Sequence, residues 1–116
     1  MNRSSDEKLY LLVRCIKQYA ILNQLYEFGA YLRDFEKHLM TIVDPKSFNR
    51  TDFLPTTKSA DDICSFIIKN ELVIQYRGLY AHYSNAINKL DANHFEIINK
   101  KIIPFLREEK IEDILK

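Results

Sequence analysis

The sequence predicts an all-α protein, a small helical bundle built on two long antiparallel helices with one or two short helices at its C-terminal end. Apolar residues recur every three or four positions over two long stretches, about residues 5–43 and 60–90, which is the period of an amphipathic helix. Only 2 glycines and 3 prolines occur among 116 residues, so few positions interrupt these stretches. The apolar share of 47% and the charged share of 28% are typical of a globular helical protein.

The first predicted helix spans about residues 5–43. It starts with a capping box, because Ser4 can accept a hydrogen bond from the backbone of Glu7 while the Glu7 side chain reaches back to Ser4. In its second half the apolar residues are spaced by 3, 4, 3, 4 and 3 positions, which is the spacing of a narrow packing seam. The residues of this seam are Leu25, Phe28, Leu32, Phe35, Leu39 and Ile42.

A bend or a break is expected near residues 22–29 of this stretch. Between Ile16 and Phe28 every apolar step is 3 positions, so the apolar stripe drifts around the helix axis. Gly29 lies inside the pattern, where glycine costs a helix about 1 kcal/mol relative to alanine. We therefore expect Gly29 to be a hinge or a point of close packing.

Residues 44–58 form the one long linker that the sequence predicts. It begins with an Asp-Pro pair at 44–45, and a residue before proline is pushed away from helical geometry. Phe48, Phe53 and Leu54 indicate that the linker lies across the core. A connection of about 15 residues is long for a helical bundle, so it is either a packed crossover or a functional loop.

The second long helix is predicted over about residues 60–90. Ser59 can cap its start, and acidic residues in its first turn suit the positive end of a helix. Asp91 can cap a third helix at about 92–103, and a last amphipathic stretch occupies 110–116. Because the chain stops within that stretch, we interpret the sequence as the front part of a longer protein.

The bulk composition favours a single domain over residues 1–116 and argues against several classes of function. With 17 basic and 16 acidic residues the net charge is +1, too balanced for a surface that binds nucleic acid by charge alone. Cys15 and Cys64 each lie alone within an apolar stretch, which predicts that both side chains are buried. Two isolated cysteines do not form a metal-ligand pattern. No signal peptide or membrane-spanning run is visible. We expect a cytoplasmic protein with no metal, no cofactor and no membrane partner.

The sharpest chemical pattern is the Arg-x4-His spacing of Arg77 and His82 within the second long helix. It is similar to the motif of HEPN ribonucleases, in which arginine and histidine from paired helices cleave RNA. The resemblance implies that Arg77 stabilises phosphoryl charge and that His82 acts as acid or base. The same spacing recurs at Arg33 and His38, and Gly78 follows Arg77 where many HEPN proteins carry a polar residue. A polar helix edge is the other interpretation of the pair.

Tyrosine is abundant, with 7 residues in the chain, and its ring and hydroxyl suit half-buried edges and interfaces. Tyr26, Tyr31 and Tyr80 lie off the main apolar stripes and could mark a partner surface or ordinary bundle rims. Together with the apolar seam, the pattern gives a set of candidate partner-binding residues. These are Tyr76, Tyr80, Tyr83, Leu25, Phe28, Leu32 and Phe35.

Three motifs follow one another near the C-terminus. An Ala-Ile-x-x-Leu pattern occupies 86–90, a paired Ile-Ile follows at 97–98, and Glu-Lys-Ile-Glu-Asp-Ile-Leu occupies 109–115. In this order they resemble the C-terminal part of phage and prophage late-gene regulators of the ArpU/RinA type, which is itself similar to sigma-factor region 4. The resemblance covers about residues 85–116.

Two features depart from that family. Pro104 stands where the family usually has Tyr or Phe with Leu, and the recognition helix that would enter the major groove is absent. The resemblance therefore implies a regulatory or dimerising part, which would contact DNA only if a recognition helix follows Lys116.

The sequence thus predicts a non-enzymatic helical interaction module of a phage-like or mobile-element regulator. It would act through helix–helix contacts with another protein or as a homodimer, and through them in transcription regulation. Two alternatives remain: an HEPN-like ribonuclease or RNA-binding protein that uses Arg77 and His82, and an inhibitor or immunity-type protein that blocks a partner enzyme.

Overall fold

The computed structural model describes residues 3–83 and 96–104. Within these ranges all regular structure is helical and no strand is present, so the predicted all-α class is confirmed. The chain divides into two compact units, Met1–Ser59 and Ala60–Lys116, and the expectation of one domain over the whole chain stays a prediction. Among the described helices none is both long and apolar enough to cross a membrane.

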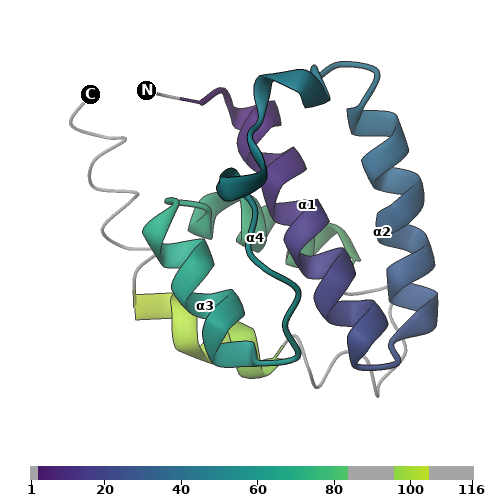
Figure 1. The fold of residues 1–116 in the computed structure, drawn as a ribbon. Helices are drawn as coiled ribbons and strands as arrows, with labels where there is room; N and C mark the ends of the chain where they lie inside the picture. The colour runs from purple at the N-terminus through teal and green to yellow at the C-terminus, as the bar shows by residue number, and fades with distance from the viewer. Residues whose placement is uncertain (1–2, 84–95, 105–116) are drawn as a thin grey trace. The chain divides into compact units, whose positions relative to one another are not determined.

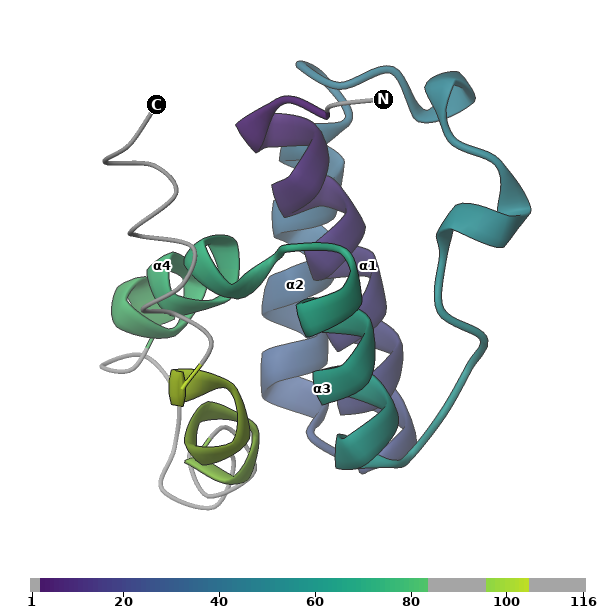
Figure 2. The ribbon, with the colours of Figure 1, turned by 90° about the vertical axis from the view of Figure 1, so that its left-hand side faces the viewer.

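In the first unit, α1 (Ser5–Leu22) and α2 (Tyr26–Leu39) form an antiparallel hairpin. The two helices lie side by side in Figure 1 and one behind the other in Figure 2, and they pack on each other. The capping box at the start of α1 is confirmed. The Ser4 amide donates to Glu7 Oε1 at 3.0 Å, and the Glu7 amide donates to Ser4 Oγ at 3.1 Å. These hydrogen bonds with Ser4 hold the pKa of the Glu7 carboxyl below its ordinary value.

The break expected near residues 22–29 is present, so the predicted helix over 5–43 is two helices. A Cβ added to Gly29 would lie 3.2 Å from Ile21 Cγ1, closer than most side-chain contacts. Gly29 has no positive φ, and it is buried inside α2. Of its two expected roles, the structure therefore supports close packing of α2 on α1.

The predicted single helix over 60–90 is wrong. The described residues form α3 (Ala60–Lys69) and α4 (Val73–Tyr83), separated by residues 70–72. No glycine or proline marks this break, and the apolar spacing continues through it. The pattern therefore predicted a continuous helix where the backbone turns.

The same turn ends α1 and α3, and it is built on a residue with positive φ, Gln24 at 62° and Glu71 at 56°. Backbone and side-chain hydrogen bonds of the same type close both turns and satisfy carbonyls at the helix ends. In the first turn the Leu25 amide donates to the Ala20 carbonyl at 2.8 Å, and the Asn23 side-chain amide donates to the Tyr19 carbonyl at 2.9 Å. In the second turn the Leu72 amide donates to the Ile67 carbonyl at 2.8 Å, and the Asn70 side-chain amide donates to the Phe66 carbonyl at 3.0 Å. The chain thus uses one Asn-Gln/Glu-Leu turn in both units.

Replacing Gln24 or Glu71 by glycine will raise the free energy of unfolding by about 0.5–1 kcal/mol each, because glycine adopts positive φ without the steric cost that a side chain carries. Both side chains are exposed, so little packing is lost. Urea unfolding monitored by circular dichroism measures the gain. Gln24→Ala and Glu71→Ala are the controls, since alanine keeps the strain. A glycine variant no more stable than its alanine counterpart would contradict the strain in that turn.

Residues 44–59 cross over α1 as a packed segment that includes the short 3₁₀ turns η1 (Pro45–Ser47) and η2 (Arg50–Asp52). Tyr10 of α1 contacts both aromatic rings of the crossover, with ring centroids 5.2 Å from Phe48 and 6.3 Å from Phe53, and the latter two lie 5.6 Å apart. Phe48 is only 8% exposed. The linker therefore lies across the core, as predicted, in the form of a packed crossover.

Two arginines of the N-terminal region cover this aromatic cluster from outside. The guanidinium carbon of Arg3 lies 4.4 Å from the Phe48 ring centroid, and that of Arg14 lies 4.2 Å from the Phe53 ring centroid. Arg3 also forms an ion pair of 2.9 Å with Asp52. Cations over aromatic faces are attracted by the ring quadrupole, so the crossover is held to α1 by rings and charges together.

In the second unit, residues 96–104 are helical. Ile98 and Ile102 are buried, at 1% and 0% exposure. The Cys64 thiol lies 3.9 Å from the carbonyl oxygen of Ile98, and Lys101 pairs with Asp61. The described part of the predicted helix at 92–103 is thus confirmed, while the stretch at 110–116 lies outside the described residues.

Candidate functional site

The structure corrects the placement of the apolar seam among partner-binding residues. Leu25, Phe28 and Leu32 are buried within the chain, at 7%, 3% and 0% exposure, and Phe35 is half-buried. The face of α2 that carries them packs against α1, its nearest neighbour along the chain. Their side chains therefore form core contacts and do not present a surface.

Of the three candidate tyrosines in α4, Tyr76 is fully buried at 0% exposure, and its assignment to a partner surface is corrected in the same way. Tyr80 is half-buried and donates its hydroxyl to Glu96 Oε1 at 2.5 Å. This hydrogen bond with Glu96 raises the pKa of the Tyr80 hydroxyl, because it favours the protonated form. The Tyr83 side chain lies outside the described residues.

Arg77 is fixed by a contact inside the second unit. Its Nη1 donates to Asn99 Oδ1 at 2.8 Å, and Asn99 is 8% exposed. This bond satisfies a polar atom that burial would otherwise leave unpaired, which is a structural role. The His82 side chain lies outside the described residues, so the pairing of Arg77 with His82 stays a prediction. Arg33 and His38 of the second match project about 140° apart around α2.

The two thiols are buried and protonated. Burial raises the pKa of Cys15 to about 12 and that of Cys64 to about 11, because a thiolate is poorly solvated inside the protein. For Cys64 the nearby Lys101 ammonium opposes this rise in part. Neither thiol has the depressed pKa of a nucleophilic cysteine, and within residues 3–83 and 96–104 no cluster of metal-ligating side chains occurs.

Both cysteines will react with an aromatic disulfide reagent roughly a hundredfold slower in the native protein than in denaturant, because reaction requires local opening.

The thiol pKa values are raised from 9.0 on folding, so their contribution to stability is full below about pH 9 and is lost as the pH rises toward 11–12. Urea unfolding across that range measures the loss. Cys15→Ala and Cys64→Ala variants with an unchanged pH dependence would contradict this origin.

The feature that sequence reasoning missed is a second seam on α2, offset from the first by one or two residues and facing outward. Its residues are spaced by 4, 3, 4 and 3 positions, and all are exposed. They are Tyr26, Ala30, Arg33, Lys37 and Met40. In an ideal helix they fall within about 80° of the circumference, so they form one continuous strip. We call these five residues the outer seam.

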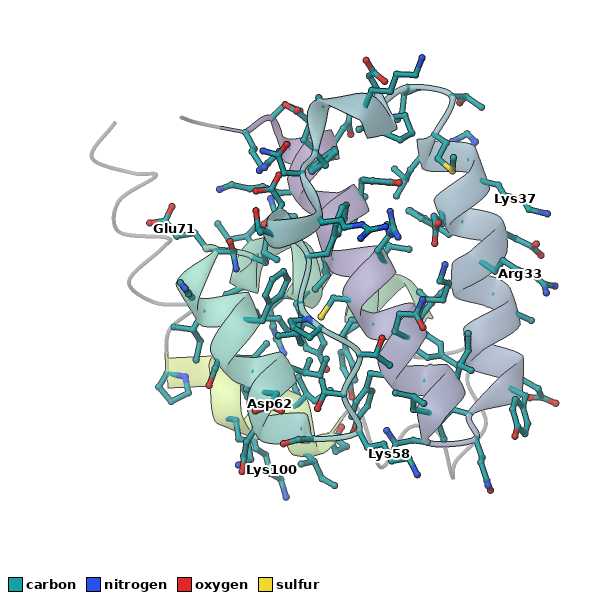
Figure 3. All side chains as sticks on the ribbon, in the orientation of Figure 1. Arg33, Lys37, Lys58, Asp62, Glu71 and Lys100 are labelled. Atoms are coloured by element: carbon teal, nitrogen blue, oxygen red, sulfur yellow. The ribbon has the colours of Figure 1, made fainter. Side chains whose placement is uncertain are left out.

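Two large apolar side chains end the outer seam, Tyr26 at 65% and Met40 at 45% exposure. Ile21 of α1, 43% exposed, packs on Gly29 beside the Tyr26 end and adds apolar surface there. Between the ends, Arg33 and Lys37 project away from α1 (Figure 3). The spacing alone could have revealed this strip, but its charged centre made it look like an ordinary solvated face.

No protein-family model, no curated protein and no solved structure matches this chain. The interpretation of its function therefore rests on its own residues.

Proposed function

We propose that the protein is a non-enzymatic helical interaction module that binds a partner protein through the outer seam of α2. The observation that supports it best is the exposure of Tyr26 at 65% and Met40 at 45% on the same strip as two cations. Aromatic residues, methionine and arginine are enriched at protein interfaces. A strip with heptad spacing is also the shape that a partner helix packs against.

The hairpin that carries the strip is well fixed, which favours binding. Lys17 of α1 and Glu36 of α2 form an ion pair of 2.5 Å in which the two side chains are only 15% and 14% exposed. Gly29 brings the two helices together at Ile21. A face that is already ordered loses little conformational entropy on association, so more of the contact energy remains as affinity.

The finer assignment to a phage-like or mobile-element regulator acting in transcription rests on the resemblance of residues 85–116. Of that segment the structure describes 96–104, in which Ile98 is buried and Ile97 is 48% exposed. An exposed Ile97 suits a module whose C-terminal part meets further protein surface. A role as an inhibitor or immunity-type protein would use the same outer seam against an enzyme.

An RNA-cleaving role would need Arg77 to turn toward phosphate. Its Nη1 donates to Asn99 Oδ1, and a rotation that breaks this bond would leave the buried oxygen of Asn99 unsatisfied, which is costly. For this reason we favour the interaction module over the HEPN-like alternative.

The test is photo-crosslinking in the host cell, with Tyr26 replaced by benzoylphenylalanine in the full chain. We expect covalent adducts larger than the protein alone, because the ring at position 26 would lie inside the interface. The matched control carries the same probe at Lys58, an exposed position of the same unit outside α2. No adducts from position 26, or the same adducts from both positions, would refute the proposed function.

A further inference from the structure

We infer that the natural occupant of the outer seam is an acidic amphipathic helix of another protein. This inference rests on the proposed function and names the chemistry of the partner. Three observations support it: the cations of the outer seam, the acidic residues beside it, and the like charges that a second copy of α2 would bring together.

Arg33 and Lys37 are the charged centre of the outer seam. Both are exposed, and within the described residues neither takes part in a hydrogen bond or an ion pair. They lie four positions apart on one helix face, where like charges repel. No acidic residue occupies a seam position between Tyr26 and Met40. A carboxylate from a partner is the group that would neutralise both cations at once.

The strip beside the outer seam is acidic and restricts how such a partner can lie. Glu27 and Asp34 are exposed and follow Tyr26 and Arg33 directly in the chain, so they form a parallel line about 100° further around α2. A partner helix with acids on all sides would meet repulsion there. A partner helix with acids on a single stripe could place them on the cations and away from this acidic line. The acidic line thus contributes to specificity by disfavouring other arrangements.

The apolar ends of the strip complete the match with an amphipathic helix. Tyr26 and Met40 lie about 21 Å apart along the axis, since each residue adds about 1.5 Å, a span of two heptads. Leucine or a similar side chain of the partner can pack on each end, while carboxylates between them meet the cations. The apolar contacts can therefore form without leaving the charges of Arg33 and Lys37 buried and unpaired.

A second copy of the chain does not fit this pattern. In a parallel pair of α2 helices, Arg33 would face Arg33 of the second copy. In an antiparallel pair related by a two-fold axis, the same flanks lie beside each other, so Glu27 would approach Asp34 of the second copy. Each arrangement brings like charges together, and like-charge juxtaposition suppresses a partner.

Binding of synthetic helical probe peptides to the full-length protein tests the inference. The peptides share a leucine stripe of about three heptads. They differ only at two positions on the same face as the leucines, and both of these positions carry Glu, Gln or Lys. Fluorescence anisotropy should show the Glu peptide bound at least about tenfold more tightly than the Lys peptide. This preference should shrink as salt is added, because exposed ion pairs are screened.

Charge reversal locates the effect. In the double variant Arg33→Glu with Lys37→Glu the preference should reverse toward the Lys peptide, while circular dichroism stays unchanged. The matched control, Lys46→Glu with Lys58→Glu, changes the net charge equally at exposed positions of the same unit outside α2 and should keep the original preference. Equal affinity for all three peptides, or a preference that survives the reversal at α2, would overturn the inference.

The inference and the proposed function fail in different ways. Sequencing of the adducts from position 26 identifies the partner segment. An acidic helix supports the inference, whereas a second copy or a segment without acids overturns it and leaves the interaction module standing. Loss of all specific adducts would refute both.

Discussion

Replacing Leu32 by alanine will lower the free energy of unfolding by about 2–5 kcal/mol. Leu32 is 0% exposed and lies at the centre of the α2 face that packs on α1. Its truncation removes buried methyl groups and leaves a cavity that the surrounding helices can only partly fill. Urea unfolding followed by circular dichroism measures the loss.

Tyr26→Ala is the matched control, on the opposite face of the same helix. Because Tyr26 is 65% exposed, its truncation should change stability by no more than about 0.5 kcal/mol while it abolishes partner contact. The two seams of α2 would then separate cleanly, one acting in folding and one in binding. A Leu32→Ala protein of unchanged stability would mean that the inner seam is not the core of the hairpin.

Phe48→Ala will lower the free energy of unfolding by about 3 kcal/mol, toward the lower end of values for buried phenylalanines because 8% of the residue is exposed. The change removes the ring contacts with Tyr10 and Phe53 and the surface on which Arg3 lies. The crossover should then detach from α1 more often. Trypsin should cut faster at the exposed Lys46 and Arg50, which limited proteolysis with mass spectrometry measures.

Two variants separate the contributions at Phe48. Phe48→Leu keeps most of the buried volume and should cost less than half as much as alanine. Arg3→Ala removes only the cation and its ion pair with Asp52, and should cost about 1 kcal/mol or less, since both groups are partly solvated. Equal losses for Phe48→Ala and Arg3→Ala would show that the charge holds the crossover and that the ring packing contributes little.

The predictions that held are those encoded by neighbouring residues. Ser4 and Glu7 cap α1 through each other's backbone, which needs only the local chain. The linker predicted from the Asp-Pro pair at 44–45 is present, since Pro45 begins η1 of the crossover, although α2 already ends at Leu39. The aromatic residues of the crossover had to be covered by something, and Tyr10 lies within reach.

The turn at residues 70–72 could not be predicted because its residues have no strong preference against a helix. Glu71 adopts positive φ only because the hydrogen bond from Leu72 to Ile67 and the Asn70 side chain close the turn. The related turn at Gln24 was anticipated only through the drift of the apolar stripe, a signal that the second turn lacks. The one available clue in the sequence was the similarity of Asn-Glu-Leu at 70–72 to Asn-Gln-Leu at 23–25, which would have indicated a second turn of the same kind.

The candidate site was predicted poorly for a different physical reason. The apolar stripe from Leu25 to Ile42 indicates burial, and the structure buries most of it: Leu32 and Leu39 are 0% and 1% exposed, although Ile42 remains 57% exposed. The free energy gained by removing apolar surface from water does not depend on which chain supplies the cover. Sequence reasoning therefore identified a seam and assigned it to a partner, whereas α1 fills that role.

The sequence by itself determined that this protein is helical, where its first helix begins, where its crossover lies and which residues avoid water. These follow from periodicity, capping and proline sterics, which act between near neighbours. Only the tertiary structure decided which of the two α2 seams faces α1 and which faces solvent. That choice depends on how α1 and α2 meet at Gly29, because packing of a helix selects one face and leaves its other residues, Tyr26, Arg33 and Lys37 among them, available for contact.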